Sequence, residues 1–481
     1  MLFLLFTTSL IPVLGNDDID NAPVEKEVIP EKSGKVYVIV NSTIHDELIS
    51  ELNQYKKDVQ KRGWEVGIVE NTFNNASSLR QFLYIKYNNE NLVGVFFVGN
   101  LPHANYEMTD EKTGYHNFPI DLYYRDLDGE WKDTDGNGIF DKHEKGKGDL
   151  KPEIWLGRIR MRTFWKDETE LYKNYFDKIH NYRTNNISVS NEALVYLDDD
   201  WTRWTGYARD SVDDLYSDVK VVDDENITVA EDYKDRIKEG YDWIQIYSHS
   251  SNSSNKHAFQ YNGGVPGSGG EFTSRDLFED GQKSLFANIY TSEAANYSSP
   301  NYLSGWYALT EDYGLANVGS TTNGGMFYYK DFYDSLSEGN SLGESFQDWW
   351  NQHGESDRSM TYGMTIIGDP TLIPLSSQGR DRIPHDPIKI DSDEKFKQTA
   401  FEEGWNGTGS KNSPYIIKNY EINSTGSSSG IYIANTTYHF KIKNCYIHDA
   451  MYLKKQKGSG IILKNTVNGV ILNNTIKENY K

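Results

Sequence analysis

The feature that most constrains the fold is an alternation of short β-branched runs with longer amphipathic stretches. From Lys35 onward, runs typical of buried strands occur at 36–40, 66–69 and 92–98, and stretches of helical periodicity separate them at 47–61 and 79–87. Parallel strands need a crossover to return to the same edge of a sheet, and a helix is the usual crossover. The pattern therefore predicts a βαβαβ unit with a mainly parallel sheet.

A second series of the same kind follows a loop-rich middle segment. The sequence predicts strands at 193–197, 243–247, 285–290 and 315–319, and helices near 168–182, 302–309 and 342–350. Two α/β units side by side and one large sheet are both consistent with this pattern.

The chain begins with an almost wholly apolar stretch, Met1 to Gly15, which runs into an acidic segment. This profile predicts a signal peptide and therefore a secreted or cell-surface protein. A short membrane anchor is the alternative, because the positively charged start of a signal peptide is missing. No other segment is long and apolar enough to span a membrane. The formal net charge of −22 argues against nucleic acid as a partner.

The pattern changes near residue 376, where polar residues and prolines replace the apolar periodicity. We assign residues 376–386 to a linker. Beyond it the sequence repeats with a period of 30, so that residues 430–435 correspond to residues 460–465. Aliphatic residues two apart, followed by an asparagine, predict stacked short strands whose asparagines turn the corners.

One acidic segment matches the calcium-loop template D-x-[DN]-x-[DN]-G-x₅-E position by position. A hard cation would relieve the repulsion between its carboxylates, and glycine permits the sharp turn. A solvated acidic turn is the alternative. Asp126 and Asp128, just upstream, are candidates for added ligands or a second ion. The predicted ligands of a structural calcium ion are Asp133, Asp135, Asn137, Asp141 and Glu144 through their side chains and Ile139 through its carbonyl.

Two of the predicted strands end in residues that can carry catalysis. His249 follows the strand at 243–247, and Ser292 follows the strand at 285–290. Open α/β sheets place their sites at the carboxyl ends of strands, so adjacent strands would bring these two side chains together. The alternative is a structural histidine. His257, in a loop rich in Ser, Asn and Gly, is a weaker candidate for the same pocket.

Several segments resemble the gingipain-like cysteine peptidases in order and spacing. The segments that carry this resemblance are residues 96–99, 121–129, 155–159, 243–250, 285–297, 315–321, 324–327 and 368–372. The resemblance covers about residues 34–375 and implies a caspase-like three-layer α/β/α fold with subdomains at about 34–185 and 186–375. The tail, residues 387–481, resembles the right-handed β-helix modules of the NosD type, which implies a β-helix fragment able to bind glycans.

The resemblance places His249 at the family's catalytic histidine and Ser292 at its cysteine nucleophile. Three positions depart from the family pattern: Ser248 and Ser250 replace the glycines that usually flank the histidine, and Ser292 replaces the thiol. The chain's one cysteine, Cys445, lies in the tail. A serine is a poor nucleophile when the histidine lacks an orienting acid. We therefore expect an impaired or inactive endopeptidase; a working Ser-His hydrolase and a non-catalytic peptide- or glycan-binding adhesion protein are the alternatives.

Overall fold

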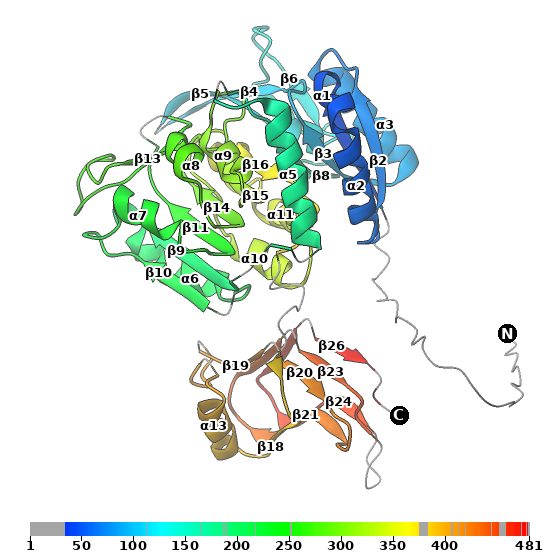
Figure 1. Cartoon of the computed structure of the whole chain (residues 1–481), viewed down its shortest axis with the longest axis vertical. Helices are drawn as coiled ribbons and strands as arrows, with labels where there is room; N and C mark the ends of the chain where they lie inside the picture. Colours follow the sequence, from blue (N-terminus) through cyan, green and yellow to red (C-terminus); the bar gives the residue numbers. More distant parts are fainter. Residues whose placement is uncertain are drawn as a thin grey trace, which may run out of the picture.

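The computed structural model describes residues 34–481 except 112, 164, 185, 188–189, 217, 251–252, 375–382, 406, 412, 419, 444, 452–457, 473, 478 and 480–481. The predicted signal peptide and most of the predicted linker lie outside the described residues. Figure 1 shows an α/β body that begins at β1 and a second body built from strands near the C-terminus. We call them the α/β body and the solenoid.

One ten-stranded sheet runs through the α/β body. In order from edge to edge its strands are β10 (Asp218–Val222), β9 (Glu192–Leu197), β11 (Trp243–Tyr247), β14 (Phe286–Tyr290), β15 (Ala316–Ser320), β16 (Met364–Gly368), β8 (Trp155–Ile159), β3 (Leu92–Val98), β1 (Lys35–Asn41) and β2 (Glu65–Asn71). The structure thus resolves the two alternatives left by the sequence in favour of a single large sheet.

The sheet consists of two parallel halves that run in opposite directions. Each half contains only parallel pairs, and the halves meet at the antiparallel pair β15–β16, where Ala316 lies opposite Gly368. We call β2, β1, β3, β8 and β16 the first half, and β15, β14, β11, β9 and β10 the second half. Strand β16 belongs to the first half although it comes late in the chain, so the halves do not coincide with the predicted subdomains at 34–185 and 186–375.

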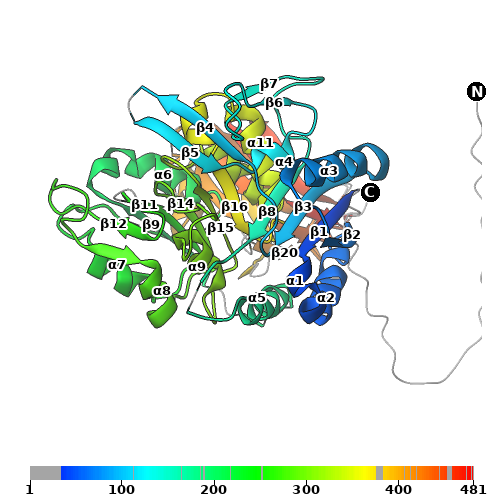
Figure 2. The ribbon, with the colours of Figure 1, turned by 90° about the horizontal axis from the view of Figure 1, so that it is seen from above.

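Helices cover both faces of the sheet and complete the predicted three layers. In Figure 2 the strands lie between a lower row of helices and an upper row. The lower row consists of α1 (Ser42–His45), α2 (Ile49–Gln60), α5 (Glu168–Arg183), α7 (Ala230–Arg236), α8 (Ser274–Asp280) and α9 (Leu303–Leu309). The upper row includes α3 (Ala76–Glu90), α4 (Leu122–Arg125), α6 (Thr205–Val212) and α11 (Leu342–His353), and α10 (Lys330–Ser337) packs between α6 and α11.

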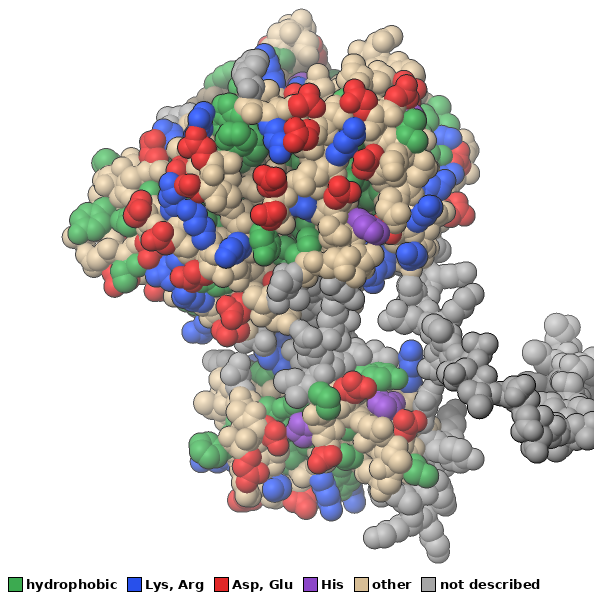
Figure 3. Space-filling view, viewed as in Figure 1, with side chains coloured by type: hydrophobic (Ala, Val, Ile, Leu, Met, Phe, Trp, Pro, Cys, Tyr) green, Lys and Arg blue, Asp and Glu red, His purple; other side chains and the backbone are tan. Residues whose placement is uncertain are grey.

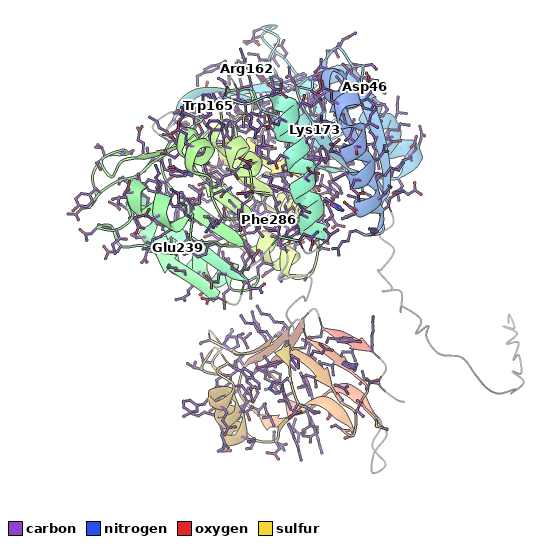
Figure 4. All side chains as sticks on the ribbon, viewed as in Figure 1. Asp46, Arg162, Trp165, Lys173, Glu239 and Phe286 are labelled. Carbon is purple, nitrogen blue, oxygen red and sulfur yellow. The ribbon has the colours of Figure 1, made fainter. Side chains whose placement is uncertain are left out.

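The strands of the second half are buried throughout, as expected for a sheet covered on both faces. All five residues of β11 and all five of β14 are buried. Phe286, labelled in Figure 4 at the start of β14, lies among the side chains that fill the space between the ribbons. No helix in the described part of the chain combines the length and apolar character needed to cross a bilayer.

Three short hairpins and several single turns complete the α/β body. The hairpins are β4 (Asn105–Asp110) with β5 (Gly114–Pro119), β6 (Glu130–Lys132) with β7 (Lys142–Glu144), and β12 (Lys256–Ala258) with β13 (Glu271–Thr273). The turns are the 3-10 helices η1 (Asp46–Leu48) and η2 (Asp199–Trp204) and the short helix α12 (Arg358–Thr361).

The solenoid contains three parallel sheets that the chain visits in rotation. After β17 (Ile383–Pro384), successive coils are formed by β18 (Ile388–Ile390), β19 (Tyr415–Lys418) and β20 (Tyr420–Asn423); by β21 (Ser429–Thr436), β22 (Phe440–Lys443) and β23 (Tyr446–His448); and by β24 (Ser459–Thr466), β25 (Gly469–Leu472) and β26 (Thr475–Lys477). Ile431 pairs with Ile461 and Ile433 with Leu463, which is the register that the 30-residue repeat predicts.

Asparagines turn the corners of the solenoid, as the sequence predicts. Asn435 and Asn465 both adopt a left-handed backbone with φ of 53°, and the Asn465 amide donates to Asn435 Oδ1 at 2.9 Å. Asparagine tolerates this conformation better than most residues do. Helix α13 (Asp393–Glu402) packs Phe396 against the aromatic side chains of the adjoining coils.

Lysines of the solenoid contact the end of α6 in the α/β body. Lys443 Nζ donates to the carbonyl of Asp214 at 3.1 Å, and Lys441 and Lys418 approach the carboxylates of Asp214 and Asp213 at 3.6 and 3.8 Å. Elsewhere acidic and basic side chains are interspersed over the face of the α/β body seen in Figure 3.

Candidate functional site

The candidate site lies where four neighbouring strands of the second half end. Strands β9, β11, β14 and β15 are adjacent and parallel, so their carboxyl ends lie at one edge of the sheet. Asp200, His249, Ser292 and Gly324 follow these four strands in that order. The structure therefore brings the predicted His249 and Ser292 to adjacent strand ends, and it adds an acid and a backbone donor that the sequence analysis did not identify.

Ser292 lies in a tight turn held by the end of β15. The next residue, Glu293, adopts a left-handed backbone with φ of 61°, and its N–H donates to the carbonyl of Thr322 at 2.6 Å. Non-glycine residues in this conformation cluster at functional sites, where the surrounding structure compensates the strain. The Ser292 hydroxyl oxygen accepts a hydrogen bond from the N–H of Gly324 at 2.9 Å.

The loop that carries Gly324 packs directly against β14. A Cβ added to Gly325 would lie 2.6 Å from the Cα of Tyr290, which is closer than real Cβ atoms come. Glycine at position 325 therefore allows the loop to approach the strand, and this approach places the N–H of Gly324 at the Ser292 hydroxyl.

Three contacts hold His249 in place: one with the carboxylate of Asp200, one with the ring of Trp201 and one backbone hydrogen bond. Its Nε2 lies 2.9 Å from Asp200 Oδ2, and the ring of Trp201 packs against it with centroids 4.6 Å apart. The carbonyl of His249 accepts from the N–H of Ala258 at 2.7 Å. In the described part of the chain, His249 makes no direct hydrogen bond to Ser292. Asp200 could have been suspected from its place three residues after the predicted strand at 193–197.

The two aspartates before Asp200 fix the loop that follows β12. Both carboxylate oxygens of Asp198 accept from the N–H of Gln260 at 3.1 Å, and Asp199 accepts from the N–H of Gly263 at 2.5 Å. Burial raises the pKa of Asp198 to about 7. Asp198 and Asp199 thus hold this loop, while the third aspartate, Asp200, faces His249.

The predicted calcium loop folds around its own first residue. Asp133 accepts hydrogen bonds from the N–H groups of Gly136 and Gly138, at 2.7 and 2.8 Å, and these bonds lower its pKa. Both glycines adopt left-handed backbones, with φ of 77° and 90°. Asn137 donates from its side chain to Glu107 at 2.7 Å, and its Oδ1 accepts from the N–H of Ile139 at 2.8 Å.

The carboxylates that the structure gathers near this loop share only two members, Asp135 and Asp141, with the template. Oxygens of Glu107, Asp135 and Asp141 lie within 4.8 Å of one another. Glu107 comes from β4, far from the template. Glu144, the last template residue, instead pairs with Lys132 and Lys142 at 2.6 and 2.5 Å.

A second group of carboxylates lies on the loops after β3. Oxygens of Asp126, Asp128 and Glu153 lie within 4.8 Å of one another. Asp126 is fully buried and lies 2.7 Å from His143 Nε2, and burial raises the pKa of Glu153 to about 7. Asp126 and Asp128 were candidate ligands in the sequence, whereas Glu153 joins them only through the fold.

Comparisons with known proteins agree with the fold. The family model "Peptidase family C25" matches residues 30–374. The crystal structure of gingipain R, an Arg-specific cysteine proteinase, aligns at a TM-score of 0.51 and 14% identity, covering 76% of this chain and 84% of that one. A structure titled as an ABC transporter, LacI family transcriptional regulator, from Brachyspira murdochii aligns at a TM-score of 0.15 and 11% identity, covering 70% of this chain and 94% of that one. No curated protein matches the sequence.

Proposed function

Because the chain belongs to peptidase family C25, we propose that Asp200, His249 and Ser292 form a peptidase site with serine in the place of the family's nucleophilic cysteine. The observation that carries this proposal is the 2.9 Å contact between His249, which follows β11, and Asp200, which follows β9, with β11 directly beside the strand β14 that carries the Ser292 turn. Its substrates are peptides or proteins, as for the family.

Each group has a defined part in this proposal. The carboxylate of Asp200 accepts a hydrogen bond from the Nε2–H of His249, which fixes the ring and leaves Nδ1 as the nitrogen able to take a proton. The Ser292 oxygen accepts from Gly324, so its own proton is available for transfer to a base. A peptide carbonyl placed beside Ser292 would then meet a nucleophile with a base on the neighbouring strand end.

We propose that this site is strongly impaired as a hydrolase. A serine hydroxyl ionises far less readily than a thiol, and general-base help must make up the difference. Asp200 orients His249 and so makes it a more effective base than a lone histidine would be. The site stays impaired because the hydroxyl and the imidazole are not in direct contact, although such contacts often tighten only when substrate binds.

A non-catalytic role is the second candidate. The serine at the nucleophile position and the attached solenoid favour a cell-surface protein that binds peptides in the cleavage site or glycans along its coils. In this case the peptidase fold would serve recognition alone, and peptides would bind without being cut.

Cleavage of a mixed peptide library separates the two candidates. We would compare the full chain with the variants Ser292→Cys and Ser292→Cys/His249→Ala, all in the presence of calcium. The proposal expects at most slow cleavage by the natural chain, an increase of about a hundredfold or more in Ser292→Cys, and loss of that gain in the double variant. Inactivity of Ser292→Cys, in a chain that still folds and binds peptides, would favour the non-catalytic role.

We also propose that the loop at 133–144 binds a structural calcium ion. The donors are carboxylate and carbonyl oxygens, which hard cations prefer, and the proximity of Glu107, Asp135 and Asp141 supports a cation there. Isothermal titration with calcium tests the site. Asp135→Asn should abolish binding, while Glu107→Gln and Glu144→Gln would show which glutamate is a ligand.

Export is the last part of the proposal. The apolar segment at 1–15 supports cleavage and release from the cell. N-terminal sequencing of the protein recovered from the medium or the cell surface tests it, because a retained Met1 would contradict a cleaved signal peptide.

A further inference from the structure

A buried polar network lies directly behind the candidate site. Ser248 and Thr291 immediately precede His249 and Ser292 in the chain, so the network and the site share the same two strand ends. The hydroxyls of Ser248 and Thr291 lie 2.8 Å apart, which joins the two strand ends. Both hydroxyls also contact Nδ1 of His257, at 2.7 and 3.0 Å.

His257 connects these strand ends to the helical layer. Its Nε2 lies 2.9 Å from the hydroxyl of Tyr307 on α9, and that hydroxyl lies 2.5 Å from the hydroxyl of Tyr233 on α7. The next residue, Ala258, donates its N–H to the carbonyl of His249. The segment that carries His257 therefore holds the catalytic histidine by its backbone and both strand ends by their side chains.

The network is sealed from solvent. The exposed fractions of its side chains are 0% for His257, Thr291 and Tyr233, 1% for Ser248 and 2% for Tyr307. Burial lowers the pKa of His257 to about 3, so the ring is neutral at physiological pH and offers one donor and one acceptor. Buried polar groups are costly to leave without partners, so each bond restrains the position of the others.

We propose that His257 is a positioning residue that sets the separation between His249 and Ser292 by holding the residue that precedes each of them. This inference rests on the proposed peptidase site. A displacement of about 1 Å between reacting groups can reduce turnover about a hundredfold. The network also gives a reason for serine at position 248, where the family has glycine: only a side chain with a hydroxyl can reach both Thr291 and His257.

The variant Ser292→Cys provides a readout that does not require turnover. The natural cysteine, Cys445, is fully buried in the solenoid, so a soluble alkylating reagent such as iodoacetamide reports on position 292. The rate of alkylation against pH gives the pKa of the introduced thiol. With His249 close by, this pKa should lie below the ordinary value of about 8.5, and adding His249→Ala should return it to that value.

Two variants then test His257 in the Ser292→Cys background. His257→Phe should raise the pKa of the thiol toward its ordinary value and slow alkylation at pH 7 about tenfold, and Tyr307→Phe, which removes one hydroxyl, should shift it in the same direction by less. His257→Gln keeps a donor and an acceptor and should restore part of the effect. Tyr307→Phe also keeps the test decisive if His257→Phe does not fold.

Tyr175→Phe is the matched control. The buried Tyr175 hydroxyl on α5 donates to the carbonyl of Leu315 at 2.6 Å, just before β15 and therefore at the opposite end of that strand from the candidate site. This variant should lower the melting temperature without moving the thiol pKa. If the His257 and Tyr307 variants behave in the same way, His257 is a core histidine only and the inference is wrong. If the thiol of Ser292→Cys itself is ordinary and insensitive to His249→Ala, the proposed site fails and this inference fails with it.

Discussion

The two halves of the ten-stranded sheet have the same architecture and carry different chemistry. The second half ends in an imidazole, a hydroxyl and their partners on four adjacent strands. The loops after β3 in the first half instead gather carboxylates, in two groups that include Asp135 and Glu153. Buried apolar strands form the centre of both halves. The inserted loops, and not the sheet, therefore distinguish the edge that carries the candidate site from the edge that gathers carboxylates.

Two glycine substitutions, one in each half, should break the molecule in different ways. A Cβ at Gly325 would lie 2.6 Å from the Tyr290 backbone, and a Cβ at Gly94 would lie 2.1 Å from the Trp155 ring. Overpacking typically costs about 1–3 kcal/mol, so both Gly325→Ala and Gly94→Ala should unfold at lower urea concentration. In the Ser292→Cys background only Gly325→Ala should also reduce cleavage, roughly a hundredfold.

Gly206→Ala serves as the control for that pair. A Cβ at Gly206, within α6, would meet nothing within 4 Å, and alanine favours a helix by up to about 1 kcal/mol over glycine. This variant should keep or increase stability. Equal loss of cleavage in Gly94→Ala and Gly325→Ala would show that the two halves are not functionally distinct.

The next largest effect concerns the orienting acid of the second half. Asp200→Asn keeps the size of the side chain but no longer stabilises a charged imidazole. In the Ser292→Cys background we expect kcat to fall about tenfold, a smaller effect than in buried triads because Asp200 is largely exposed. Steady-state kinetics would measure it, with Asp210→Asn, on an exposed face of α6, as the control. An unchanged kcat would remove Asp200 from the site.

Calcium should act on the first half with a more moderate effect. An ion that binds only the folded state adds about 2.7 kcal/mol of stability at a hundredfold excess over its dissociation constant. For a chain of this size we expect the melting temperature to rise by a few degrees. Scanning calorimetry with and without calcium would measure this, and Asp135→Asn should remove the shift. A shift that persists in Asp135→Asn would place the ion elsewhere.

The effect that we expect to be smallest near neutral pH is the acid sensitivity contributed by His257. Burial lowers its pKa to about 3 in the folded chain, whereas an unfolded histidine has a pKa of about 6.5. Between these values the unfolded chain binds the extra proton, so stability falls as the pH decreases from about 6.5 toward 3, by at most about 1.4 kcal/mol per pH unit. Urea unfolding at several pH values should show a shallower slope in His257→Gln. An identical slope would mean that other groups cause the loss.

Local pattern was sufficient to predict much of the fold. The buried strands at 243–247 and 285–290, the 30-residue repeat and the corner asparagines are all present, because strand burial and turn conformation depend on neighbouring residues. The positions of His249 and Ser292 at strand ends followed from the same pattern.

Contacts between segments that lie far apart in the sequence could not be predicted from local pattern. Asp200, the N–H of Gly324, and the inclusion of Glu107 and Glu153 in the carboxylate groups depend on which strands are neighbours and how far their loops reach. The antiparallel pairing of β15 with β16 was also not predictable, because the residues of a buried strand do not show in which direction its neighbour runs.

The sequence by itself therefore determined the kind of sheet, the repeat of the solenoid, and the chemical groups at the two candidate positions. Only the tertiary structure decided that His249 has an acid beside it, that Ser248 and Thr291 are joined through His257, and that the two halves meet at an antiparallel strand pair. The physical reason is that local periodicity encodes burial and direction along the chain, while hydrogen bonds between segments far apart in the sequence depend on strand order and register.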